Sequence, residues 1–90
     1  MRFALICLDK PGALQTRVEN RSAHLAHIEA TGVVEQAGPF LDQDGQMCGS
    51  LIILGVSSRA EAEAWAAMDP YAKAGLFASV SVQEWKRVVG

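Results

Sequence analysis

The stretch Asp69-Pro70-Tyr71-Ala72-Lys73-Ala74-Gly75-Leu76 separates two patterns that predict different structures. An alanine-rich helical pattern ends at Met68, and residues 78–88 alternate in polarity as a strand does. Within the stretch, Asp69 is placed to cap a short turn in which Pro70 is the first helical residue and Gly75 the closing one. A capping carboxylate keeps a second oxygen that can accept the N–H of an imidazole, so a further role for Asp69 stays open.

The rest of the chain divides into four apolar or alternating runs and two helical patterns. Asp44-Gly45 predicts a tight hairpin between the second and third runs, and Pro39 suits an edge strand because it cannot donate to a ladder on both sides. The predicted elements are strands at residues 3–8, 32–41, 47–56 and 78–88, a helix at residues 16–31, and a helix from its N-cap Ser58, with Glu61 as capping-box partner, to Met68.

This βαββαβ order predicts one α+β domain over residues 1–90. The first and third strands are the most apolar and belong in the centre of the sheet, whereas the second and fourth are more polar and belong at the edges. Only an antiparallel sheet of order 4-1-3-2, with both helices on one face, fits this order and the hairpin. The pattern therefore predicts a ferredoxin-like plait.

The first helix carries the residues on which a functional interpretation depends. Thr16-Arg17-Val18-Glu19 has the form of a capping box, and Gly32 suits the position just past the helix end. On a helical wheel one stripe is expected to face the core, and His24 lies at its edge. That predicted core stripe consists of Leu14, Val18, Ser22, Leu25 and Ile28.

The central strands are apolar on both faces, yet two helices cover only one face of a four-stranded sheet. We therefore expect a homodimer formed through the helix-free sheet face, as a barrel-like α/β assembly. A formal net charge of −2 gives no electrostatic case for nucleic acid or for an anionic membrane surface, and no apolar run is long enough to span a bilayer. Cys7 and Cys48 lack disulfide or zinc spacing, so we expect a cytoplasmic protein with reduced thiols, Cys7 being buried.

Two histidines are the only side chains that titrate near neutrality. His24 is either a half-buried helix residue bonded to the backbone or a general base. His27 lies on a more exposed side, and the pair has no third clustered ligand, so neither metal nor cofactor is expected. Arg21, one turn before His24, is either a solvated surface residue or the group that binds an anionic part of a substrate. Tyr71 is most simply a core or interface aromatic.

Several short motifs occur in an order that resembles the YciI-like (YCII-related) family. They are Phe3-Ala4-Leu5-Ile6-Cys7-Leu8-Asp9-Lys10, Arg21-Ser22-Ala23-His24-Leu25, Ala37-Gly38-Pro39, Gly49-Ser50, Asp69-Pro70-Tyr71 with Ala74-Gly75-Leu76, and Val80-Ser81-Val82. The resemblance implies a ferredoxin-like fold that forms dimers with an α/β-barrel core. It also implies an active site built from His24 and Asp69, whereas His27 matches no motif. The loop at residues 41–47 is shorter than in many relatives.

Some members of the family are lyases or dehydrochlorinases acting on small ring compounds, such as chlorinated muconolactone-type molecules. The resemblance therefore implies a cofactor-free enzyme in which His24 removes a proton from the substrate and Asp69 orients the imidazole ring of His24. A small polar or lactone-like molecule would be bound by Arg21, Ser50 and Tyr71. Two alternatives stay open: a module that binds a metabolite without turnover, and a purely structural domain, which leaves the histidine and aspartate unexplained.

Overall fold

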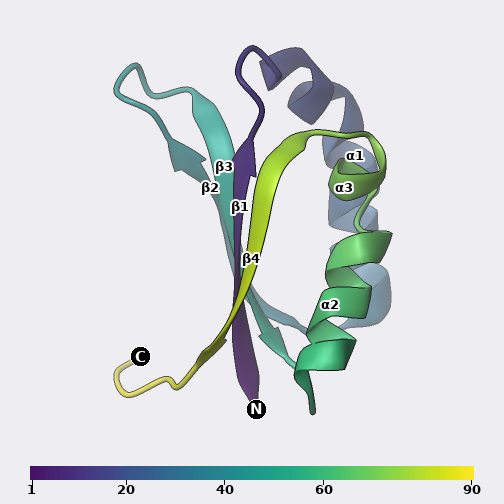
Figure 1. The fold of residues 1–90 in the computed structure, drawn as a ribbon, viewed down its shortest axis with the longest axis vertical. Coiled ribbons are helices and arrows are strands. Elements are labelled where there is room, and N and C mark those ends of the chain that lie inside the picture. Colours follow the sequence, from purple (N-terminus) through teal and green to yellow (C-terminus); the bar gives the residue numbers. More distant parts are fainter.

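The computed structural model describes all residues, 1–90, and has the predicted order of elements, with the short turn expected after Asp69 forming a helix of its own (Figure 1). The four strands form one antiparallel sheet in the order β2-β3-β1-β4, which is the predicted order 4-1-3-2 of a ferredoxin-like fold. The elements are β1 (Arg2–Asp9), α1 (Leu14–Thr31), β2 (Val34–Leu41), β3 (Met47–Gly55), α2 (Arg59–Met68), α3 (Pro70–Lys73) and β4 (Phe77–Trp85).

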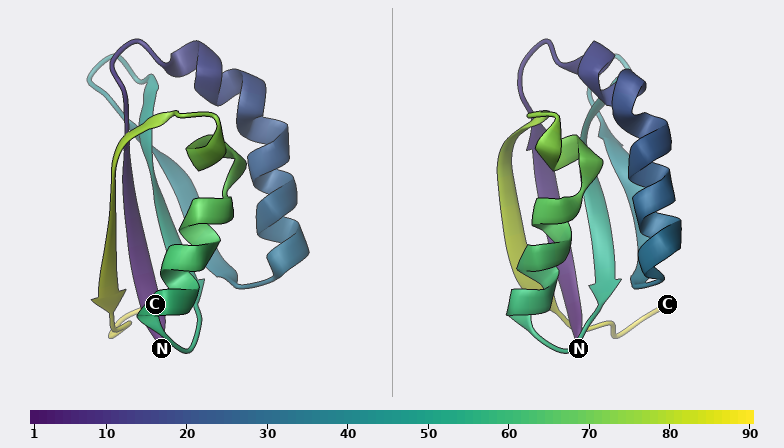
Figure 2. Two further views of the ribbon diagram at one scale, coloured as in Figure 1. Left: turned by 45° about the vertical axis from the view of Figure 1, so that its right-hand side comes forward. Right: turned by 90° about the vertical axis from the view of Figure 1, so that its right-hand side faces the viewer.

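All three helices lie on one face of the sheet, with α1 and α2 side by side (Figure 2). Alternate residues of the central strands point at the helices and form the core with two residues of α2. The buried core cluster consists of Phe3, Leu5, Cys7, Ile52, Leu54, Ala62 and Trp65. The intervening residues of β1 and β3 face away from the helices; Ile6 and Leu51, which pair across the two strands, are 37% and 38% exposed in the single chain.

Three predicted boundaries are wrong. β2 begins at Val34 and not at residue 32, because Gly32 still ends α1. α1 begins at Leu14, two residues earlier than predicted, and no capping box forms because Thr16 already lies inside the helix; the N-cap is Ala13, without a side-chain cap. Gly12, at φ +71°, makes the tight turn from which the chain enters the helix directly. β4 ends at Trp85 and does not reach residue 88, because Trp85 pairs with Arg2, the first residue of β1.

The predicted core face of α1 is wrong except at Ile28, which is partly buried and packs against the core. The buried residues of this helix are Arg17 (2% exposed) and His24 (6%), whereas Val18 (53%) and Leu25 (47%) point outward. The helix is turned so that polar side chains face the sheet and α3, where each of them has an ionic partner. Gly32 ends α1 in the left-handed conformation, as predicted.

The remaining local predictions agree with the structure. Ser58 caps α2 by accepting a hydrogen bond from the Glu61 amide, and Asp42 and Gly45 close the β2–β3 hairpin. Cys7 is buried, and neither it nor Cys48 forms a disulfide. None of the helices has the length and apolar character needed to cross a membrane.

Candidate active site

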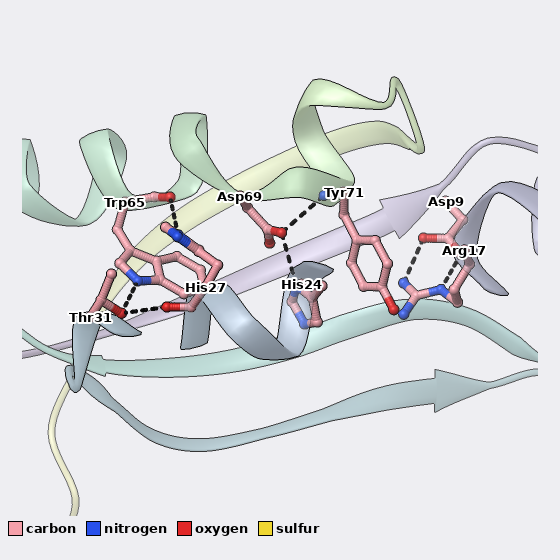
Figure 3. A network of polar contacts seen from close by, with 8 residues as sticks. All are labelled: Asp9, Arg17, His24, His27, Thr31, Trp65, Asp69 and Tyr71. Atoms are coloured by element: carbon pink, nitrogen blue, oxygen red, sulfur yellow. Dashed lines mark hydrogen bonds and ion pairs between the residues drawn. The ribbon is translucent and has the colours of Figure 1, made fainter. Parts of the chain in front are cut away.

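Asp69 lies where α2 ends and α3 begins, and it links this junction to α1 (Figure 3). Its Oδ1 accepts a hydrogen bond from the Tyr71 amide at 3.0 Å, which caps α3, and Pro70 is the first residue of that helix. The same Oδ1 lies 2.8 Å from Nδ1 of His24. Asp69 thus both caps the turn and contacts the histidine, although one oxygen makes both contacts where two were expected.

The carboxylate of Asp69 fixes the tautomer of His24. An ionised carboxylate can only accept hydrogen bonds, so the proton of a neutral imidazole resides on Nδ1 and the lone pair on Nε2. Nε2 has no hydrogen-bond partner in the protein. Every side-chain nitrogen or oxygen that is fully buried does have such a partner, so Nε2 is not fully buried and must be accessible from the adjoining cavity. An imidazole with one nitrogen held by a carboxylate and the other open is arranged as a proton acceptor.

Tyr71 stacks on the imidazole and joins it to a second ionic group. The ring centroids of Tyr71 and His24 are 4.0 Å apart, with 14° between the planes. The guanidinium carbon of Arg17 lies 4.7 Å from the Tyr71 centroid, and the phenol oxygen points toward Arg17 in Figure 3. Arg17 in turn donates two hydrogen bonds, of 2.7 and 2.8 Å, to the carboxylate of Asp9 at the end of β1.

Burial and charge shift two pKa values in this group. Burial raises the pKa of the Tyr71 phenol, and the nearby guanidinium groups of Arg17 and Arg21 only partly oppose that change, so the phenol stays protonated. Burial by itself lowers the pKa of Arg17, but the hydrogen bonds and charge of Asp9 outweigh it, and the net pKa of Arg17 is raised. Arg17 therefore keeps its charge inside the domain.

The cavity beside His24 measures about 120 Å³ and lies between α1 and the β2–β3 pair. Arg21 and Ser50 line it; Arg21 is exposed and has no ion pair. Ser50 is buried as a residue, but its hydroxyl oxygen has no protein partner and is therefore accessible from the cavity. The lining residues are Arg17, Arg21, His24, Leu25, Ile28, Ala37, Gly38, Pro39, Met47, Ser50, Ile52 and Tyr71. A larger hollow of about 500 Å³, centred on β2 and the neighbouring part of β3, has no ionisable side chain, so it offers no acid–base group.

The close approach of β3 to β1 explains why position 49, just before Ser50, is a glycine. A Cβ at this position would lie 2.5 Å from the Cys7 carbonyl oxygen, so only glycine lets β3 approach β1 this closely. Cys7 itself is buried beneath the site. Its pKa is raised to about 12, first by burial and then by the negative charge of Asp69, so it remains a thiol and is no nucleophile.

His27 lies outside the cavity. Its Nε2 faces the Trp65 carbonyl oxygen at 3.4 Å, and its ring lies 4.5 Å from the Trp65 ring. Trp65 donates to the Thr31 hydroxyl at 2.8 Å, and that hydroxyl donates to the carbonyl of His27. These contacts join α1 to α2. The structure contains no group of three or more histidine, cysteine or carboxylate side chains arranged to hold a metal ion.

The structure brings all five predicted site residues to one place. His24, Arg21, Ser50 and Tyr71 line the cavity, and Asp69 holds His24 from behind. Arg17 and Asp9 were not among the predicted site residues. Arg17, Arg21 and His24 stand at positions i, i+4 and i+7 of one helix and therefore share a face, which is the signal that could have found Arg17.

Comparison with known proteins agrees with this architecture. Residues 1–86 match the YCII-related domain family. The chain belongs to this family. The protein YciI of Escherichia coli O6:H1 is 34% identical, with 98% of this chain and 99% of that protein covered. An uncharacterised protein of Haemophilus influenzae is 32% identical with the same coverage.

One protein of related sequence whose structure has been solved has a named activity. The YCII-related chain matches 5-chloro-2-hydroxyhydroquinone dehydrochlorinase of Burkholderia phenoliruptrix, determined in complex with 2,5-dihydroxybenzoquinone, at 38% identity and a TM-score of 0.86. The match covers 96% of this chain and 94% of that one. An antibiotic biosynthesis monooxygenase, 12% identical with a TM-score of 0.56, shares the fold alone.

Proposed function

We propose that this protein is a cofactor-free enzyme of the lyase or isomerase type that moves protons on a small oxygenated ring compound. The observation that carries the proposal is the state of His24: Nδ1 is held by Asp69, and Nε2 opens into a cavity beside Arg21 and Ser50. The similarity to a dehydrochlorinase of a hydroxylated chlorohydroquinone supports the same class of chemistry.

The chemistry can be written for a ring that bears hydroxyl groups and a halide. Nε2 of His24 takes the proton of a ring hydroxyl and returns it to the carbon that bears the halide. It then takes a second hydroxyl proton while the halide leaves with the electron pair of its bond to carbon. The products are a quinone, a halide ion and a proton that passes to water. Carbon–halogen reduction balances ring oxidation, so no external oxidant is needed.

The residues around the cavity have different roles in these reaction steps. Asp69 stabilises the imidazolium that forms twice in a turnover, and it keeps the tautomer that leaves Nε2 free. Arg21, the unpaired cation at the cavity, binds the enolate oxygen that develops on the ring. Ser50 and the edge of Tyr71 contact the remaining ring oxygens. Without a halide, the same proton transfers give an isomerisation.

Turnover of 5-chloro-2-hydroxyhydroquinone tests the proposal. Chloride release and quinone absorbance are followed for the wild type, His24→Gln and the matched control His27→Gln. Because general base catalysis contributes about 10²–10⁴-fold, His24→Gln should lose about 10³-fold in rate and His27→Gln should keep the wild-type rate. Equal rates in the two variants would contradict the assignment of His24.

The same experiment separates an enzyme from a metabolite-binding module. Such a module would bind 2,5-dihydroxybenzoquinone, measured by titration calorimetry, and would release chloride no faster than buffer. The enzyme binds this compound and also turns over the chlorinated ring. Binding with no turnover of halogenated or lactone-like rings would therefore favour the module.

We also propose a homodimer formed through the helix-free face of the sheet. Ile6, Leu8 and Leu51 point away from the helices and are part-exposed in the single chain, which leaves an apolar area on the two central strands. Sedimentation equilibrium of the wild type should give twice the chain mass of 9.6 kDa. Leu51→Asp should give a monomer, whereas Val18→Asp, an equal change on the outer side of α1, should stay dimeric. A wild-type monomer at micromolar concentration would overturn this assembly.

A further inference from the structure

The ion pair between Arg17 and Asp9 is buried, so its formation costs desolvation free energy in a domain of only 90 residues. The two side chains are 2% and 5% exposed. Removing two charges from water costs free energy that their attraction often fails to recover, and apolar residues of similar size usually serve stability as well or better. The same helix carries Val18 and Leu25 on its outer side. An arginine on the buried face, one residue before an exposed valine, therefore calls for a role other than stability.

The contacts of Arg17 lead directly to the imidazole. Both Nε and Nη2 donate to Asp9, and this two-point attachment fixes the plane of the guanidinium. That guanidinium lies over the ring of Tyr71, and the ring of Tyr71 lies nearly parallel to that of His24. Phe77 meets Tyr71 edge-on at 6.0 Å and 83°. Four side chains from β1, α1 and α3 thus form a continuous column, Asp9–Arg17–Tyr71–His24, seen in Figure 3.

We propose that Asp9, Arg17 and Tyr71 are positioning residues that hold the imidazole of His24 in its working plane. The hydrogen bond to Asp69 fixes Nδ1 but leaves the ring free to tilt about that bond. The flat contact with Tyr71 removes this freedom and keeps Nε2 directed into the cavity. Arg17 holds Tyr71 through the cation–π contact, and Asp9 holds Arg17. The inference rests on the proposed function only in taking His24 as the proton carrier.

Nuclear magnetic resonance of the ligand-free protein tests the column without any assay of activity. A stacked phenol shifts the carbon-bound ring protons of His24 upfield, and the ¹⁵N shifts of the imidazole report the Nδ1–H tautomer. Tyr71→Phe keeps the ring and should keep both signatures, whereas Tyr71→Leu should lose the upfield shift. Asp9→Asn should reduce the upfield shift although residue 71 is still tyrosine, because Arg17 no longer holds the Tyr71 ring against His24. Asp44→Asn, a carboxylate exposed in the β2–β3 turn, is the matched control.

A double variant guards against loss of folding. Asp9→Asn with Arg17→Met removes both buried charges together, so it leaves no unpaired ion and should retain the wild-type unfolding midpoint or exceed it. The column predicts that this stable variant nevertheless loses the upfield shift of His24. Its affinity for 2,5-dihydroxybenzoquinone should fall about tenfold, as expected when one charge-assisted hydrogen bond is misaligned.

The outcomes divide cleanly. A reduced shift in the double variant, with the shift retained in Tyr71→Phe and Asp44→Asn, supports the column even if the protein turns over no substrate. An unchanged His24 shift in the folded double variant overturns it and leaves the ion pair with a structural role alone. Because the signatures are recorded without ligand, their failure is distinct from failure of the proposed enzyme activity.

Discussion

Two polar networks leave the same helix, three residues apart, and they place their histidines in opposite situations (Figure 3). At His24 the partner is a buried carboxylate that takes Nδ1 and leaves Nε2 open to a cavity. At His27 the partner is a backbone carbonyl of Trp65, and no carboxylate is bonded to the ring. The first arrangement favours a ring that gains and loses a proton. The second holds a helix pair together.

The difference between His24 and His27 comes from the group bonded to each imidazole more than from the burial of the ring. A carboxylate stabilises the imidazolium that a general base must become, whereas a carbonyl oxygen contributes much less to that charge. The first partner is supplied by a break in the helix: Asp-Pro ends α2, and the new turn of α3 brings its capping carboxylate to α1. At Trp65 the helix continues, and it offers only a carbonyl and a ring.

The largest effect expected from this comparison is that of Asp69→Asn. The amide can donate to Nδ1 and so favour the tautomer whose proton blocks Nε2, for which the expected loss of rate is on the order of 10³-fold or more. Because the same Oδ1 faces His24 and caps α3, an amide nitrogen that donates to Nδ1 cannot accept from the Tyr71 amide, so the free energy of unfolding should fall by about 1 kcal/mol through loss of the cap. Chloride release and chemical denaturation measure the two quantities. Equal rates for Asp69→Asn and for the exposed control Asp44→Asn would show that the carboxylate does not act through His24.

A smaller and opposite result is expected for Trp65→Phe in the second network. The change removes the hydrogen bond to Thr31 and part of a buried ring, and it should lower the free energy of unfolding by about 1–2 kcal/mol. Its turnover rate should match that of the wild type, because none of these atoms reaches the cavity. A loss of rate as large as that of Asp69→Asn would mean that the two networks act as one unit.

Much of this arrangement could be predicted from the sequence, and the successes have local causes. The sheet order followed from two apolar runs in a βαββαβ order, and the cap at Asp69 followed from Asp-Pro with a glycine five residues later. The assignment of His24 as the partner of Asp69 depended on resemblance to a family, because the two residues are 45 positions apart and no local pattern joins them.

Arg17 shows why the rest was not predicted. A wheel drawn for apolar residues placed the core on the side of Val18 and Leu25, and the structure turns that side outward. The buried side is held by pairs with Asp9 on β1 and Asp69 before α3, and such pairs become visible only when the strands and the second helix are in place. Hydrophobic periodicity fails where the helix face that meets the sheet carries a site.

The smallest expected effect concerns Cys7, which reports how far the charge of Asp69 reaches. The native pKa of Cys7 is about 12 against an ordinary value of 9.0, raised first by burial and then by Asp69. Between these two values the native state keeps a proton that the unfolded chain releases, so the free energy of unfolding should fall as the pH rises above 9. Cys7→Ala should flatten this part of the pH dependence, and Cys48→Ala should not. Asp69→Asn should lower the pKa of Cys7 and narrow the pH range over which the free energy of unfolding falls, whereas His27→Gln should leave this range unchanged. An equal response to both substitutions would break the separation between the two networks.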